Sequence, residues 1–434
     1  MPRFARTVGC LGLTLAVTLP ITASAESLAD AWRMALASDG ALAAVRSTRE
    51  AAESDRAAAS RQRLPVLELT GNYTQLEHSP ILDIETPAGR LQSPKIWRND
   101  AYARAGADLS IPLWTSGRIS GAIGVAAAGA RGAGAVEARS AADLKLAVAE
   151  AYIAVFRARS ALEVAQSSVA SLQAHAGDVQ VMYDKEAVAQ SDLLAARVAL
   201  SNVLQQRLRA SNALRVATAA YNRRVGQPLD RPPELDPPGD VHPDASTGDL
   251  APLIARAQQQ RPELAAMAAQ GSAFAEAARA QRAEGLPQVA VHAGYNHIDN
   301  QILDRQNFAS VGVGFQWKLF DIGQVRARVS ALRSRSRASN QQLADLQSQV
   351  ALEVETAVLD REEAAARIHV ATDAVAQAEE NLRLAKELYG SGLGTNTQVL
   401  DAEAMRVMAL TNRDSATFDL IIAGYRVQRT IGEL

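Results

Sequence analysis

The residue types that this sequence has in small number exclude several classes of protein. Its 434 residues include one cysteine, Cys10, and only 4% are aromatic. One cysteine cannot form a disulfide within the chain, so packing alone must stabilise the fold. A formal net charge of −2 lacks the basic excess typical of nucleic-acid-binding proteins. Scarce aromatics and abundant alanine favour long, closely packed helices over the thick core of a compact enzyme.

The first 25 residues are typical of a secretory signal peptide. Two arginines precede an apolar run, which ends at Ala23-Ser24-Ala25. This order of charged, apolar and small residues predicts export with cleavage before Glu26. Lipidation of Cys10 is a minor alternative, because the cysteine lies before the apolar run rather than after it. No later stretch has the 18 apolar residues that a membrane-spanning helix requires, so we expect no helical anchor.

The rest of the chain consists of two copies of one unit. Leu64-Pro65 matches Leu286-Pro287 at an offset of 222, and Leu113-Trp114 matches Leu319-Phe320 at an offset of 206. The difference predicts a loop sixteen residues longer in the first copy, between about residues 75 and 102. Such a repeat indicates a duplicated unit rather than unrelated domains. We predict a first repeat over residues 26–226, a Pro-rich linker over 227–248 and a second repeat over 249–434.

Each unit has the pattern helix, strand, strand, helix, helix, which defines an α+β fold. The first helix is expected to run from Ser27 to Arg63, because Pro65 ends it. Helices of about 65 residues begin after Gly117 and Gly323 and would be about 100 Å long. Their seven-residue apolar spacing, interrupted at Arg361, predicts coiled-coil packing. Alternation of apolar and polar residues predicts strands over residues 66–75, 102–113, 288–297 and 308–319.

The strands have one apolar and one polar face, which is typical either of a membrane β-barrel or of a soluble sheet packed on a core. Glu68, Arg104 and Asp108 on the polar face suit a water-filled lumen. Aromatic residues gather near the strand ends, as they do at membrane interfaces. The smallest membrane barrels have about eight strands. Four strands therefore cannot close, and several copies would have to build a barrel together.

Taken together, these features resemble the TolC-like family of outer-membrane efflux and secretion channels, the outer membrane factors. The resemblance rests on the signal segment, the double repeat, the strand-to-helix junction Pro112–Arg118 and the Tyr-x-x-Gly turn at Tyr389–Gly392. It implies a homotrimer with a twelve-stranded transmembrane β-barrel in the outer membrane, continued through the periplasm by a coiled-coil tunnel. It also implies passive, gated export with a periplasmic adaptor (membrane fusion) protein and an inner-membrane transporter, in a tripartite efflux or type I secretion system.

The same resemblance implies a gate at the turns that join the long helices. Tyr389 and Asp401 match the Tyr-x-x-Gly and Leu-Asp motifs of the family, and Asp192 takes the position of a tip aspartate. The position of the gate arginine holds Gly394, and the first ring aspartate is replaced by Gln398, so Asp401 is the expected ring residue. Three copies of Asp401 would favour cations at the entrance. The adaptor is expected to dock on the two turns at Glu186, Ala187, Gly392, Leu393 and Gly394.

Simpler explanations exist for each of these residues. Asp192 and Asp401 can complement a helix dipole, and Tyr389 can be a seam residue of the coiled coil. The six histidines form no His-Glu-x-x-His motif, and cleavage leaves no cysteine to bind metal. We therefore expect neither a cofactor nor an enzyme.

A rival function is that of an exported periplasmic coiled-coil adaptor or scaffold. Such a protein would also carry long helical hairpins, but it would not need two matched pairs of amphipathic strands. The identity of an exported substrate, whether drug, metal ion or protein, stays open.

Overall fold

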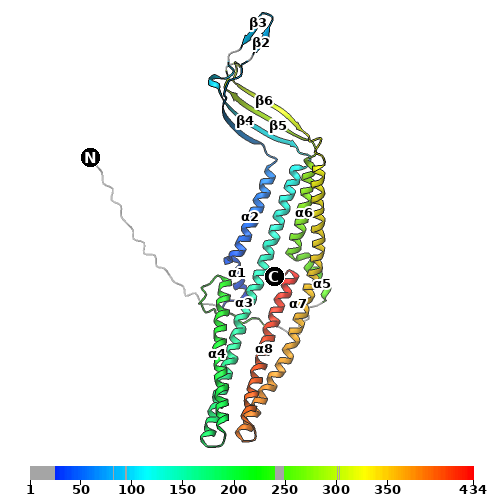
Figure 1. Cartoon of the computed structure of the whole chain (residues 1–434). Coiled ribbons are helices and arrows are strands. Elements are labelled where there is room, and N and C mark those ends of the chain that lie inside the picture. The colour runs from blue at the N-terminus through cyan, green and yellow to red at the C-terminus, as the bar shows by residue number, and fades with distance from the viewer. Residues whose placement is uncertain (1–24, 82, 93–94, 240–248, 301, 303) are drawn as a thin grey trace, which may run out of the picture.

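The protein is elongated, with a sheet at one end and two helical hairpins at the other (Figure 1). The computed structural model describes residues 25–434 except 82, 93–94, 240–248, 301 and 303. Apart from Ala25, the predicted signal segment over residues 1–25 lies outside the described residues. The first repeat contains α1 (Leu28–Ser38), α2 (Gly40–Arg61), β1 (Val66–Gln75), β2 (Asp83–Thr86), β3 (Gly89–Gln92), β4 (Ala101–Trp114), α3 (Arg118–Asp184) and α4 (Gln190–Val225). The second contains α5 (Leu250–Gln260), α6 (Pro262–Ala283), β5 (Gln288–Ile298), β6 (Asn307–Gln316), α7 (Gln324–Gly390) and α8 (Asn396–Ile431).

The first helix of each repeat is broken in two, which the helical pattern alone did not predict. In the first repeat the break is at Asp39, whose backbone is extended and whose carboxylate accepts a hydrogen bond of 2.7 Å from the backbone N–H of Leu42. This is a typical helix N-cap. In the second repeat the break is at Arg261, and Pro262 occupies the first turn of α6, where proline is well tolerated. The single helix expected over residues 27–63 was therefore wrong, and Asp39-Gly40 was the signal for the break.

The main sheet is antiparallel, with strand order β1-β4-β5-β6. Its register aligns the apolar residues of all four strands on one face, in the row Leu67, Leu109, Ala293 and Val311. The neighbouring row, Glu68, Asp108, Gly294 and Ser310, lies on the other, polar face. Strand β6 ends three residues before its predicted end, because Trp317 turns away and donates its indole N–H to the carbonyl of Gly285 at 3.2 Å. The longer loop of the first repeat carries the small hairpin β2–β3.

The helices form a single curved layer below the sheet (Figure 1). Both α3 and α7 have 67 residues and run from the sheet to the hairpin turns. In the upper half, α2 packs on α3, and α6 packs between α3 and α7. In the lower half, α4 returns along α3, and α8 packs against α7 and α3. The returning helices stop at Gly226 and Gly432, both with positive φ, a common way to end a helix.

The middle of the molecule contains the largest apolar cluster. Tyr152 and Tyr221 are fully buried there, and burial raises the pKa of both phenols. The linker, expected to be a surface connector, takes part in this region: Leu235 is buried, and its neighbours Glu234 and Asp236 pair with the backbone of Glu26. The hydroxyl of Tyr152 also donates to the Asp236 carbonyl. The described part of the linker therefore closes the core at mid-length.

Among the described helices, one is long and apolar enough to cross a membrane by length and composition. It is α3, which contains an 18-residue window with a mean hydropathy of 1.3. The sequence analysis expected no such segment. Because α3 packs along α2 and α6, and because its first part is apolar through alanine and glycine, we assign it to the helical layer.

Close packing of α3 on α6 depends on Gly121, which gives a first prediction. A Cβ atom at this position would lie 2.8 Å from the backbone nitrogen of Ala280. We expect Gly121→Val to destabilise the folded protein by about 1–3 kcal/mol, because the helices must separate. The measurement is the thermal unfolding midpoint of the detergent-solubilised protein, followed by circular dichroism.

The matched control for this prediction is Gly129→Ala, on the same helix. A Cβ at Gly129 has nothing within 4 Å, and alanine is the better helix former by about 1 kcal/mol. The control should therefore unfold at or slightly above the wild-type midpoint. A Gly121→Val protein with the wild-type midpoint would contradict the close contact.

Candidate periplasmic gate

The candidate gate is built from the two helical turns at the end of the molecule distant from the sheet (Figure 1). In the second turn, the backbone N–H groups of Leu393 and Gly394 both donate to the Leu388 carbonyl at 2.9 Å, and Gly392 has a φ of 77°. In the first turn, Glu186 occupies the corresponding position with a φ of 58°. A left-handed backbone costs a side-chain-bearing residue about 1–2 kcal/mol relative to glycine. The two turns thus share one backbone path despite different residues.

The residues expected to contact an adaptor are open to solvent at these turns. Glu186, Ala187 and Gly392 are exposed, and Leu393 is 80% exposed, whereas Gly394 is half-buried. Covering an apolar side chain as exposed as Leu393 with another surface is favourable, because it removes apolar area from water. Of the five residues, Leu393 is therefore the strongest candidate for a contact with another protein.

Behind the turns, an apolar cluster packs the two hairpins of one chain together. Val179 of α3 and Val399 of α8 are completely buried in it. Its other buried members are Ala176, Leu193, Ala196, Leu382, Ala385, Tyr389 and Ala402. Since the cluster draws on all four helices of the hairpins, separating the hairpins would expose it to water.

Tyr389 lies inside this cluster. It is 6% exposed, and its ring meets the His175 imidazole edge-on, with centroids 5.3 Å apart. Its hydroxyl is buried and has no hydrogen-bond partner among the residues that the structure describes. Burial and the nearby Asp192 carboxylate raise the pKa of Tyr389. Within the described part of the chain the tyrosine packs as a seam residue, and the role of its hydroxyl as a latch stays a prediction.

A hydrogen-bonded chain beside Tyr389 joins three helices. The Nε2 atom of His175 on α3 lies 2.8 Å from Oδ1 of Asn396 on α8, and both side chains are buried. The amide nitrogen of Asn396 donates to the backbone carbonyl of Asp192 on α4 at 3.0 Å. Because this assigns the nitrogen of Asn396 as donor, its oxygen must accept from His175. The sequence analysis missed His175 and Asn396, whose only signal was polarity within an apolar seam.

A second polar link lies on α3 about one helical turn closer to the sheet. Ser171 donates its hydroxyl to the Glu403 carboxylate at 2.8 Å and accepts from Nζ of Lys386 at 2.9 Å. Glu403 is 2% exposed and is neutralised by Arg406 at 2.8 Å. A buried carboxylate requires such a partner, because its transfer from water is costly. This link connects α3 to both helices of the second hairpin.

The two predicted aspartates have different environments. Asp192 is half-buried in the first turn of α4, where a negative charge complements the helix dipole. Asp401 is exposed and is the sixth residue of α8, outside its first turn. The dipole explanation therefore fits Asp192 and does not fit Asp401. No group of three or more metal-ligating side chains occurs among the described residues.

Further from the tip, a buried ion pair joins the upper and lower helices. Arg429, near the end of α8, contacts Glu263 at 2.6 Å, and its Nε donates to Asp143 of α3 at 2.8 Å. Burial would raise the pKa of Glu263, but the hydrogen bond and charge of Arg429 hold it below its ordinary value. The ion pair between Arg429 and Glu263 therefore holds the start of α6 to the end of α8.

Comparison with known proteins agrees with this architecture. Residues 253–422 match the family described as "Outer membrane efflux protein". Outer membrane protein TolC of Vibrio cholerae is 24% identical over 426 residues, which cover 96% of this chain and 93% of that protein. Among solved structures, VceC of Vibrio cholerae has a TM-score of 0.79 at 17% identity, covering 93% of this chain and 96% of that one. The Neisseria gonorrhoeae MtrE channel, solved in its open state, has a TM-score of 0.74 at 16% identity, covering 93% and 88%.

An amphipathic sheet above a layer of paired helical hairpins defines a TolC-like channel protein. The chain has the fold of the TolC-like outer-membrane channels, and its residues 253–422 match the outer membrane efflux protein family. It belongs to the outer membrane of Gram-negative bacteria and extends into the periplasm. The family that it matches is one of transport ducts rather than enzymes.

The contrast between Tyr389 and Asn396 gives a second prediction. We expect Tyr389→Phe to leave single-channel conductance and tip stability unchanged, because the lost hydroxyl has no described partner. Asn396→Ala leaves His175 and a backbone carbonyl unpaired, which costs about 1–3 kcal/mol. It should accelerate hydrogen exchange of the amides at both turns about tenfold or more and increase the fraction of open channels in a planar bilayer.

Asn381→Ala is the control, because Asn381 is exposed on α7 and makes only a weak contact with the sulfur of Met405. It should exchange and conduct like the wild type. A channel opened by Tyr389→Phe would show that the tyrosine is a latch after all.

Proposed function

We propose that three copies of this chain form a closed, twelve-stranded barrel in the outer membrane and a continuous helical tunnel in the periplasm. The tunnel is a passive, gated export duct, in which an inner-membrane transporter supplies the energy and a periplasmic adaptor joins the two. The proposal rests on one observation: in the single chain, the sheet and the helical layer each have an open edge on both sides.

The sheet supplies the first pair of open edges. Strands β1 and β6 each pair on one side only, so each leaves a row of backbone N–H and C=O groups without partners. Lipid offers no hydrogen bonds, and open strand edges do not occur in the hydrocarbon region. The apolar face of β1 and β6 is also exposed, with Leu69 78% and Val311 81% accessible. Pairing of β6 with β1 of the next copy satisfies both requirements.

The helical layer has matching edges. The outermost helix on one side is α4, whose exposed apolar residues Leu194, Val198, Leu208 and Val216 recur at helical spacing on one face. On the other side α7 presents a similar stripe of Leu352, Leu359, Val370 and Leu388. A sustained apolar stripe on a helix needs a partner helix. We infer that α7 of one copy packs on α4 of the next.

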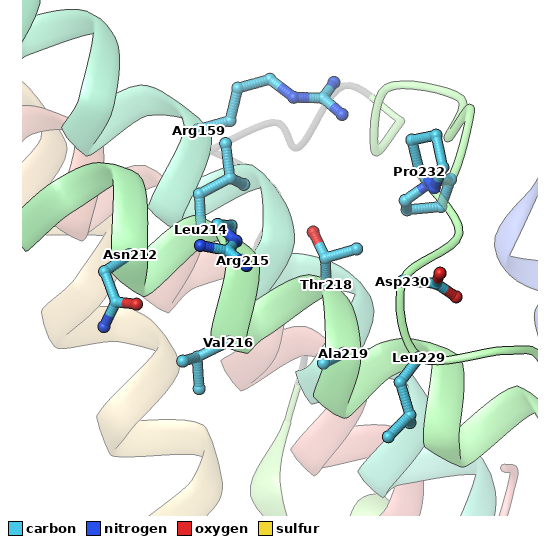
Figure 2. A pocket seen from close by; sticks show the side chains of 11 residues that line it. Arg159, Asn212, Leu214, Arg215, Val216, Thr218, Ala219, Leu229, Asp230 and Pro232 are labelled. Carbon is cyan, nitrogen blue, oxygen red and sulfur yellow. The ribbon is translucent and has the colours of Figure 1, made fainter. Parts of the chain in front are cut away.

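A hollow beside α4 fits this assembly. It has a volume of about 640 Å³ and lies between Arg159 of α3, Val216 of α4 and the linker residues Leu229 and Pro232 (Figure 2). Leu229 is 58% exposed. We infer that side chains of the neighbouring copy fill this hollow, which places it in the interface between copies rather than at a ligand site.

At the tip, we propose that the turns at Glu186 and Leu393 dock the adaptor, while Asp401 rings the entrance. The exposure of Leu393 and the position of Asp401 beyond the first turn of α8 support this assignment. Asp192 and Tyr389 then act inside the tip by packing the hairpins. Adaptor binding would open the duct by loosening the His175–Asn396 and Ser171–Glu403 links.

The third prediction tests strand pairing between copies. In the single chain, Gly106 of β4 pairs with Asn296 of β5. The repeat offsets of 206 and 222 carry this pair to Gly312 of β6 and Thr74 of β1 in the next copy. Paired strands place such residues about 4.5–5.5 Å apart, within reach of a disulfide. We expect Gly312→Cys/Thr74→Cys to form covalent dimers and trimers on non-reducing gels.

The background is clean, because the only cysteine lies in the predicted signal segment. Space around Gly312 is open, with nothing within 4 Å of an added Cβ. The control pair is Gly312→Cys/Thr70→Cys, which shifts one cysteine by four residues, about 13 Å along the strand. Monomers in the test pair, or equal cross-linking in the control, would contradict the proposed barrel.

The fourth prediction concerns the entrance ring. Three Asp401 carboxylates brought close together would attract cations electrostatically. We expect Asp401→Asn to lower cation preference in planar-bilayer recordings, whereas Asp184→Asn, at the end of α3, should change it less. Unchanged selectivity in Asp401→Asn would remove this residue from the ring.

A further inference from the structure

A hollow lined by arginines lies between α6 and α7, on the side of the molecule near the sheet. Its volume is about 470 Å³. Arg279 and Arg282 come from α6, and Arg333 and Arg337 come from α7. The other lining residues are small: Ala275, Ala278 and Ser336. Neither the channel function nor the gate accounts for four cations around one hollow.

These positive charges are poorly compensated within the chain. Arg279 pairs with Glu276 at 2.7 Å, and Arg337 donates to the Ser334 hydroxyl at 3.0 Å. The guanidinium groups of Arg282 and Arg333 make no hydrogen bond or ion pair with any residue that the structure describes. Like charges held together in one hollow raise the local potential and attract anions.

The hollow faces the outside of the tunnel. Helix α6 contacts α3 through Glu276 and Ala280 and contacts α7 through Gly271. At about 100° per residue, Arg279 lies between these two contact directions, and Arg282 lies close to the direction of α7, where both line the hollow. Because α3 and α6 run in opposite directions and touch through Gly121 and Ala280, helical rotation places Arg279 on the side of the layer opposite to Arg118 of α3.

An independent contact supports this orientation. Arg118, at the start of α3, lies on the other side of the helical layer by the same reasoning. Its Nε donates to Oε1 of Gln288 at 3.1 Å, and Gln288 belongs to the polar face of β5. Arg118 therefore marks the lumen side of the helical layer, and Arg279 marks its outer side.

The hollow also lies at the right level for a membrane surface. Arg282 is six residues before β5, within about 10 Å of the strand along a helical path. At the base of the sheet, Trp317 is 47% and Phe320 is 88% exposed, as aromatic residues are at a bilayer interface. A cation just beyond such aromatics meets the headgroups of the periplasmic leaflet.

We propose that this hollow binds the phosphate headgroup of an anionic phospholipid in the periplasmic leaflet of the outer membrane. Arginine pairs with phosphate through two parallel hydrogen bonds, and the small residues of the hollow leave room for the group. The bound lipid would fix the height of the channel in the membrane. The inference depends on the outer-membrane location and is independent of the adaptor and of the proposed gate.

The experiment measures lipid binding to the detergent-solubilised full chain. Dissociation constants are determined for phosphatidylglycerol, for zwitterionic phosphatidylcholine and for inorganic phosphate. The test variant is Arg333→Gln/Arg337→Gln. The control is Arg328→Gln/Arg335→Gln, which removes the same charge from two exposed positions of α7 that do not line the hollow.

Phosphatidylglycerol should bind the wild type and the control alike and bind the test variant about tenfold more weakly, because charge-assisted hydrogen bonds are lost. Equal binding by test and control variants would overturn the proposal. Inorganic phosphate binding as tightly as phosphatidylglycerol would identify a free phosphate site and overturn the lipid assignment. If the test variant does not fold, Arg333→Lys/Arg337→Lys keeps the charge, and undiminished binding by it would argue against bidentate recognition.

Discussion

Backbone hydrogen bonding at the edges of a four-stranded sheet is the constraint on which the whole protein depends. Each strand must find partners on both sides once lipid replaces water, and β1 and β6 find only one within the chain. In the helical layer, the apolar stripes on α4 and α7 are likewise exposed in the single chain and need partner helices. A single chain therefore supplies one segment of the proposed barrel and tunnel. Its alanine-rich composition suits that role, since the helices pack side by side in a layer rather than around a solid core.

Two devices hold this thin layer together where helices meet. Glycine permits α3 and α6 to approach so closely that an added methyl group would touch the backbone at Ala280. At mid-length, where α8 ends and α6 begins, Arg429 bridges Glu263 and Asp143. The low pKa of Glu263 means that this ion pair stabilises the junction at neutral pH and is lost only as the pH falls through that value. Small residues set the spacing of the helices, and buried charges set their register along the axis.

Polar residues at the two ends of the helical layer serve different purposes. At the tip, His175, Asn396 and Glu403 are buried and fully engaged, so they tie the hairpins of one chain to each other. Near the sheet, Arg282 and Arg333 are left without partners among the described residues, so they are available to a ligand from outside. Buried and paired polar groups specify how the hairpins of one chain pack, whereas exposed and unpaired ones indicate contact with the surroundings.

Periodicity and repeats in the sequence determined the duplicated α+β unit, the four strands and the two 67-residue helices, because each depends on local spacing of apolar residues. The same pattern did not reveal the break at Asp39, where one capping side chain overrides helical propensity. Family motifs pointed to Tyr389, yet only the packed tip showed that its hydroxyl has no partner among the described residues and that His175 and Asn396 form the link. Likewise, net charge gave no hint of the arginine hollow, because its members lie on two helices about fifty residues apart in sequence. The sequence determines the spacing of residues along the chain. Which side chains meet across helices depends on the rotation and register of those helices, and only the tertiary structure decides these.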